Sequence, residues 1–268
     1  MEKIICGSGL SKPVNFDSKN SFIEASLFLQ AGHEECGDSA FIYHDDEKVI
    51  VAVFDGVSGE SGAAAASCDC ATSMLGFLKN HNKIDKKKME EAFVHSNKSI
   101  KFGFTTATIA FITKNGEFML ASVGDSPVYS INKGEAALEI PPARAVGNDH
   151  SILKFFHFRN LVSSVLGGNA EFELKISSGK LTGGEIVILA SDGLSDNLFV
   201  LTNDGYILDS SGSSDLISII GNIKSPSAIT KKLASEISIR MKGTRIDKPN
   251  AILVPKKDDL SIISLLFI

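Results

Sequence analysis

Four aspartates stand where a loop meets a predicted strand: Asp38, Asp55, Asp192 and Asp258. Asp55 and Asp192 close short apolar runs and are each followed at once by a glycine, whereas Asp38 and Asp258 stand just before apolar runs. Four carboxylates that converge would form an all-oxygen site suited to Mg²⁺ or Mn²⁺. Each could instead be an ordinary turn aspartate, because Asp favours turns. The repeated strand–Asp–Gly arrangement favours a shared site.

The Asp55-Gly56 pair indicates the chemistry of such a site. A glycine at position 56 would let the backbone carbonyl approach an ion that a side chain would crowd. Two divalent ions about 3.5–4 Å apart, bridged by a carboxylate, can lower the pKa of a water and so supply a nucleophile for attack on phosphorus. The chain lacks a Cys-x5-Arg phosphatase loop, a Gly-x-Ser-x-Gly elbow and a Gly-x4-Gly-Lys-Ser/Thr loop. The sequence therefore favours a metal-activated water over a covalent nucleophile.

A phosphate ester also needs a cation to orient it. Three candidates lie close in sequence to the aspartates: His33, Arg144 and His150. A lone histidine is more often a surface or capping residue, and only its placement five residues before Asp38 distinguishes His33.

The elements that must position these residues are mainly strands that arrive in antiparallel-looking pairs, with helical segments between them. An Asn115-Gly116 turn is typical of a hairpin. This order predicts an α+β fold of two sheets with helices outside them, as a single domain over residues 1–268. The irregular segment 141–170 could be a flap near the site or a plain connection. Strands are predicted at 39–44, 48–54, 104–112, 117–123, 127–131, 171–176, 185–190 and 260–267, and helices at 60–79, 86–101, 213–222 and 226–241.

The composition is that of an ordinary globular protein, with 43% hydrophobic and 22% charged residues, so a packed core is expected. A net charge of −5 argues against nucleic acid as a partner, and no apolar run approaches the length of a membrane span. The four cysteines, at positions 6, 36, 68 and 70, are expected to be reduced and mostly buried. The expectation is an intracellular, cytoplasmic monomer without a membrane anchor.

Taken together, the motifs resemble the metal-dependent serine/threonine protein phosphatases of type 2C, the PPM family, chiefly their compact bacterial-style members. The matching stretches follow the order of that family over roughly residues 35–265. They are Gly37-Asp38-Ser39-Ala40-Phe41, Val53-Phe54-Asp55-Gly56, Phe104-Thr105-Thr106-Ala107, Val123-Gly124-Asp125-Ser126, Asp149-His150-Ser151, Leu166-Gly167, Ala190-Ser191-Asp192-Gly193-Leu194 and Asp258-Asp259-Leu260-Ser261.

The resemblance implies two antiparallel sheets packed as a sandwich and flanked by helices on both outer faces, with a flap-like segment near 145–170. It implies hydrolysis of phosphoserine and phosphothreonine in phosphorylated protein substrates. It also implies a set of metal ligands for two Mn²⁺ or Mg²⁺ ions and a weaker third. In that set Asp55 bridges two ions, Gly56 gives its carbonyl to one, Asp38 acts mainly through waters, Asp192 and Asp258 hold the other ion, and Asp125 holds the third.

The chain departs from the family pattern at several of these positions. His33 stands where the family usually has an arginine that grips the substrate phosphate. The final Asp-Asn pair of the family is Asp258-Asp259 here, so either carboxylate could be the ligand, and the register favours Asp258. Two hypotheses remain open: an active phosphatase, or a catalytically weak pseudophosphatase that serves as a binding module.

Overall fold

The computed structural model describes residues 1–57, 61–143, 161–198, 200–201, 207–209, 211–243, 246–248, 251–253 and 256–268. Two six-stranded sheets, antiparallel at each of their strand pairs, form its centre. The first has the order β1 (Glu2–Cys6), β4 (Ser39–His44), β5 (Lys48–Phe54), β6 (Ala107–Thr113), β7 (Glu117–Val123) and β10 (Lys175–Lys180). The second has the order β2 (Val14–Lys19), β3 (Ile23–Gln30), β16 (Leu260–Phe267), β11 (Ile186–Ala190), β8 (Val128–Asn132) and β9 (Glu135–Ile140).

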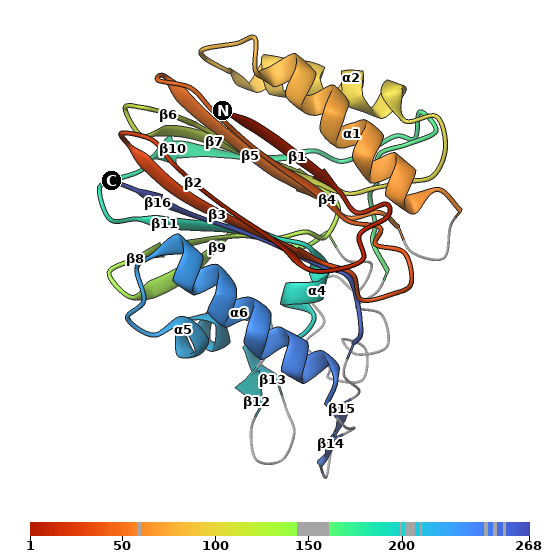
Figure 1. The fold of residues 1–268 in the computed structure, drawn as a ribbon, viewed down its shortest axis with the longest axis vertical. Helices are drawn as coiled ribbons and strands as arrows, with labels where there is room; N and C mark the ends of the chain where they lie inside the picture. Colours follow the sequence, from red (N-terminus) through yellow and green to blue (C-terminus); the bar gives the residue numbers. More distant parts are fainter. Residues whose placement is uncertain are drawn as a thin grey trace.

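The helices lie on the two outer faces of this sandwich, as Figure 1 shows. Helices α1 (Ala63–Leu78) and α2 (Lys86–Ser99) cover the first sheet, while α5 (Ser213–Ile220) and α6 (Pro226–Met241) cover the second. The short helix α4 (Asp192–Ser195) follows β11 directly. Two small hairpins complete the described elements: β12 (Val200–Leu201) with β13 (Ile207–Asp209), and β14 (Ile246–Lys248) with β15 (Ala251–Leu253). The predicted α+β sandwich with four layers is confirmed.

Strand β5 illustrates how the sequence produces these layers. Successive side chains of a strand point to opposite faces of its sheet. In β5 the residues at 49, 51 and 53 belong to the apolar core between the two sheets, and those at 50, 52 and 54 belong to the core beneath α1 and α2. A strand buried on both faces has no polar alternation, which explains the continuous apolar run in its sequence.

The predicted strands miss part of each sheet. No strand is predicted before residue 39, yet β1, β2 and β3 lie there. The segment 171–176 is predicted as a strand, whereas β10 begins at Lys175 and ends at Lys180. β10 is an edge strand that pairs only with β7, and it is largely exposed, so it carries no hydrophobic signal. Within the described residues, no helix is both long and apolar enough to cross a membrane.

Candidate metal centre and active site

Strand register brings the predicted aspartates to one end of the sandwich. In the β4–β5 hairpin Ser39 pairs with Phe54, so Asp38 and Asp55 extend from the same end of the first sheet. In the second sheet Ala190 of β11 pairs with Ile262 of β16, which places the segments of Asp192 and Asp258 together. Asp125 lies where the chain crosses from β7 in the first sheet to β8 in the second. Residues far apart in sequence therefore meet because antiparallel pairing fixes their ends.

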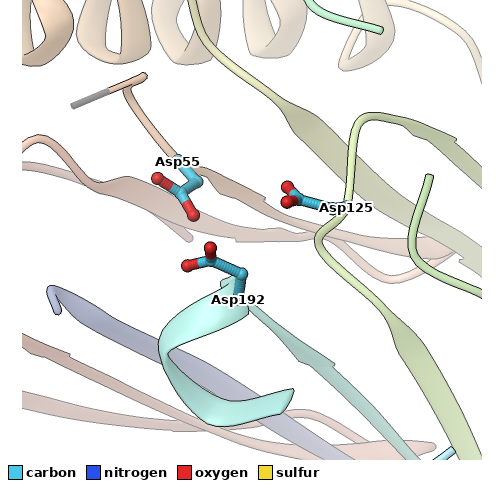
Figure 2. Close-up of side chains that lie close together, drawn as sticks. All are labelled: Asp55, Asp125 and Asp192. Carbon is cyan, nitrogen blue, oxygen red and sulfur yellow. The ribbon is translucent and has the colours of Figure 1, made fainter. Parts of the chain in front are cut away.

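Three carboxylates form the centre of this group. One carboxylate oxygen from each of Asp55, Asp125 and Asp192 lies within 4.8 Å of the other two (Figure 2). Burial raises the pKa of Asp55 well above its usual value, and the charge of Asp192 raises it further. Charged carboxylates this close repel one another unless a cation lies between them. The donor set is all oxygen, which is the set that Mg²⁺ and Mn²⁺ prefer.

Asp38 lies deeper than this group, with an exposed fraction of 1%. Neither of its carboxylate oxygens makes a hydrogen bond of normal geometry among the described residues, although the hydroxyls of Ser191 and Ser261 lie near enough to stabilise its charged form in part. Burial raises the pKa of Asp38, and the charges of Asp259 and Asp258 raise it further. A buried carboxylate that is stabilised only in part is costly, so the position of Asp38 fits a role toward a cation or the waters around it.

The structure distinguishes the two neighbouring aspartates at the start of β16. Asp259 accepts hydrogen bonds from the backbone N–H groups of Gly32, at 2.7 Å, and Gly37, at 2.6 Å. Its carboxylate is thereby committed to holding the segment between β3 and β4. Asp259 also lines a cavity of about 640 Å³, together with His33, Gly37 and Gly56. Asp258 lines a second cavity, of about 270 Å³, together with Asp55, Asp125 and Asp192. Its place among the other carboxylates favours Asp258 as the ligand.

The second cavity contains the cations of the site. His33, with a side chain that is 48% exposed, has its Nε2 atom 3.8 Å from an oxygen of Asp258. Lys256 was not predicted, although it stands only two residues before Asp258 in the sequence; its ammonium contacts the carboxylates of Asp192, Asp196 and Asp258. The other two predicted cations, at positions 144 and 150, lie outside the described residues, as does most of the predicted flap.

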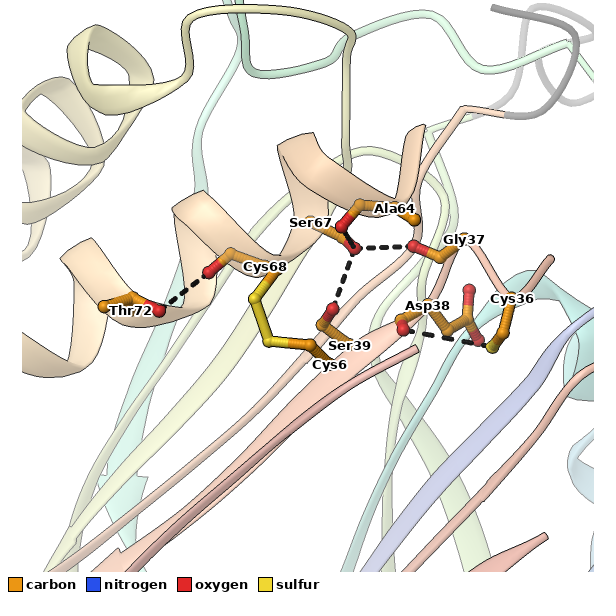
Figure 3. Close-up of a disulfide and its surroundings, with 9 residues drawn as sticks. All are labelled: Cys6, Cys36, Gly37, Asp38, Ser39, Ala64, Ser67, Cys68 and Thr72. Atoms are coloured by element: carbon orange, nitrogen blue, oxygen red, sulfur yellow. Dashed lines mark hydrogen bonds between the residues drawn. A yellow bond between two sulfur atoms is a disulfide. The ribbon is translucent and has the colours of Figure 1, made fainter. Parts of the chain in front are cut away.

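Helix α1 supports the segment that carries Asp38 (Figure 3). The Ser39 hydroxyl lies 2.8 Å from that of Ser67, which in turn donates a hydrogen bond of 2.6 Å to the carbonyl of Gly37. At the next position of the helix, Cys68 forms a disulfide with Cys6 at the end of β1.

This disulfide corrects the expectation that the cysteines at 6 and 68 are reduced. The Cα atoms of the two residues are 5.2 Å apart because α1 packs against the edge of the sheet where β1 pairs with β4. That proximity is not visible across 62 residues of sequence. The cysteines at 36 and 70 are free and buried, as expected. The cysteine content therefore no longer supports an intracellular location.

Three glycines allow the backbone of the site to pack closely. A Cβ atom on Gly32 would lie 1.9 Å from the carbonyl oxygen of Asp258, and one on Gly193 would lie 2.0 Å from that of Asp259. A Cβ on Gly56 would lie 2.5 Å from the carbonyl oxygen of Ala63. Packing against the start of α1 therefore already requires glycine at position 56, and the predicted approach of its carbonyl to an ion stays a prediction.

Comparison with known proteins finds relatives in sequence and in fold. The "Probable protein phosphatase 2C 1" of Oryza sativa subsp. japonica is 24% identical over 241 residues, which cover 86% of this chain and 70% of that protein. The serine/threonine phosphatase Stp1 from Staphylococcus aureus matches with a TM-score of 0.67 at 18% identity, covering 92% of this chain and 95% of Stp1. RsbX in complex with magnesium matches with a TM-score of 0.62 at 20% identity, covering 95% of this chain and all of RsbX. No family model matches the chain.

The chain has the PPM phosphatase fold. The resemblance that the motifs carry is thereby confirmed, by a relative in sequence and by relatives in architecture. In this PPM fold the described aspartates at 38, 55, 125, 192 and 258 all lie at or beside one cavity at the end of the sandwich. The described residues that line this cavity include two lysines and a histidine but no arginine.

Proposed function

We propose that this chain is a metal-dependent phosphatase that hydrolyses phosphoserine and phosphothreonine in protein substrates. The observation that carries the proposal is the group of Asp55, Asp125 and Asp192, whose oxygens lie within 4.8 Å of one another at the end of a PPM fold. The buried carboxylate of Asp38 supports it, because the charges of Asp259 and Asp258 lie close to it and a cation between them would relieve the repulsion. The similarity to type 2C protein phosphatases supports the substrate class.

Each residue of the site would have a separate role in this reaction. Two divalent ions, when bound, supply a hydroxide nucleophile at neutral pH and neutralise charge that develops on the phosphoryl group. Asp55, the carbonyl of Gly56, Asp192 and Asp258 would hold these two ions, and Asp125 would hold a weaker third. Asp38, which is more deeply buried than the other carboxylates, would orient waters of the site.

Three hydrogen bonds with Thr105 and Thr106 hold Asp55 in place. The backbone N–H of Asp55 donates a hydrogen bond of 3.1 Å to the hydroxyl of Thr106. The Asp55 carbonyl accepts hydrogen bonds from the Thr106 N–H, at 2.8 Å, and the Thr105 hydroxyl, at 3.0 Å. These bonds fix the end of β5 and so direct the Asp55 carboxylate at the cavity. Little conformational entropy is therefore lost when an ion binds there.

Hydrolysis of an aryl phosphate by chelator-treated protein, with and without added Mn²⁺, tests the proposal. Turnover is expected only with the metal, and a phosphothreonine peptide should also be hydrolysed. A metal-independent rate, or none with either substrate at any metal concentration, would contradict it.

A catalytically weak pseudophosphatase is the second candidate function. The observation that favours it is the contact of Lys256 with both Asp192 and Asp258, together with the histidine at position 33. Such a protein should bind a phosphothreonine peptide in a titration and leave it intact.

His33 is proposed to orient the substrate phosphate. We expect His33→Ala to raise KM by about tenfold and to lower kcat much less, as for a residue that binds substrate and transition state alike. His33→Arg should lower KM, because a guanidinium is always charged and can bind phosphate with two donors. Steady-state kinetics on an aryl phosphate measure both changes.

The matched control is His95→Ala, the same change on the exposed face of α2, which should alter neither constant. A KM that is unchanged in His33→Ala would remove His33 from the site, and Arg144 would become the next residue to test.

A further inference from the structure

Lys256 is the cation that the structure places deepest in the site. Its side chain is 12% exposed, and its Nζ atom lies 2.8 Å from an oxygen of Asp258 and 2.8 Å from one of Asp196. The same ammonium also contacts an oxygen of Asp192. One positive charge is therefore shared by three carboxylates, from α4 and its end on one side and from the start of β16 on the other.

The position of this lysine is fixed by its backbone as well. The carbonyl of Lys256 accepts a hydrogen bond of 3.1 Å from the side-chain amide of Asn197, which donates a second one, of 2.9 Å, to the carbonyl of Gly193. Asn197 is itself 2% exposed. The segment that carries Lys256 is thus anchored to α4, and the ammonium is directed at that end of the cavity.

The ion pair of Lys256 with Asp196 also contributes to the stability of the fold. The side chain of Asp196 is fully buried, and a buried charge left without its counter-ion is strongly destabilising. Loss of the Lys256 ammonium would therefore destabilise the folded protein.

Two of its three partners are the carboxylates that the proposed function assigns to one divalent ion. A divalent ion bound to Asp192 and Asp258 would have to share their oxygens with an ammonium, and like charges at such distances repel. The ion pairs described for Lys256 are with these three carboxylates and do not include Asp55.

We propose that the Lys256 ammonium is a built-in cation of this site, which competes with one of the two divalent ions for Asp192 and Asp258. The inference rests on the proposed metal-dependent function. It makes binding of that ion weak, so that this chain reaches its fully loaded form only at a high concentration of the metal.

Calorimetric titration of Mn²⁺ into chelator-stripped, full-length protein tests this. In Lys256→Met one binding event should become at least about tenfold tighter, which is about 1.4 kcal/mol, and the other should change much less. Lys231→Met is the matched control, since Lys231 is exposed on α6, does not line this cavity and makes no ion pair among the described residues. In a parallel melting experiment, Mn²⁺ should raise the Tm of Lys256→Met more than that of the unmodified protein.

The outcomes separate the two proposals. Isotherms that are the same for Lys256→Met and the unmodified protein would overturn the role of Lys256 and leave the metal-dependent function standing. Absence of Mn²⁺ binding in every variant would overturn the metal-dependent function, and this inference with it. If Lys256→Met fails to fold, Lys256→Met with Asp196→Asn removes both charges of the buried pair and must show the same tightening for the inference to hold.

Discussion

Asparagine at position 55 or 192 is expected to lower Mn²⁺-dependent phosphate hydrolysis by at least about a thousandfold, which corresponds to about 4 kcal/mol of transition-state stabilisation. Each substitution keeps the shape of the side chain and removes one charge from a group whose oxygens lie within 4.8 Å of one another. An amide is a poorer ligand for a divalent ion than a carboxylate, so the loss should appear in kcat and in metal affinity. Activity assays at several Mn²⁺ concentrations measure both.

The two variants should differ in stability without metal. Asp55→Asn removes repulsion from the carboxylates around it and should raise the Tm of the metal-free protein. Asp192→Asn also removes a partner of Lys256, so no such increase is expected. Asp69→Asn, at an exposed position of α1, is the control for loss of one negative charge. Full activity in both site variants would show that the catalytic centre lies elsewhere.

The second large effect concerns the neighbouring pair at the start of β16. Asp259→Ala is expected to lower the free energy of unfolding by about 3 kcal/mol or more, because two backbone N–H groups lose a charged acceptor. For a chain of this size that is a fall in Tm of roughly 6–12 °C. Asp258→Ala should leave the Tm of the metal-free protein much closer to that of the unmodified chain and should weaken Mn²⁺ binding instead.

Thermal melting of the metal-free proteins and calorimetric Mn²⁺ titration together distinguish the two roles. The assignment would be reversed if Asp259→Ala were stable and lost metal affinity while Asp258→Ala unfolded early. Equal behaviour of the two variants would show that the pair acts as one unit.

Local sequence patterns place Asp55 and Asp192 at the ends of strands, whereas Asp125 is indicated only by the family resemblance. Asp55 and Asp192 follow apolar runs that could only be buried strands, and a turn such as Asn115-Gly116 specifies its hairpin within a few residues. Antiparallel pairing then brings those strand ends together, so the sequence predicts a group of aspartates at one end of the sheets.

Other features depend on contacts that the sequence does not encode locally. The surroundings of Asp258 and Asp259 differ because the carboxylate of Asp259 accepts hydrogen bonds from Gly32 and Gly37, more than two hundred residues away. The pairing of the cysteines at 6 and 68 requires the edge strand β1 to lie beneath α1, and β1 itself was not predicted. Lys256 resembles any surface lysine until α4 is placed beside it.

The glycines at 32, 56 and 193 make this active site vulnerable at positions that carry no functional group. A methyl group at any of them would overlap a carbonyl oxygen, and at 32 and 193 that oxygen belongs to Asp258 and Asp259. A related sequence could therefore keep every aspartate and still hold them in the wrong place. Surveys that sort such relatives into active and inactive enzymes by their acidic residues alone would misclassify these cases. The small residues behind the carboxylates are an equally informative record of whether selection has maintained catalysis.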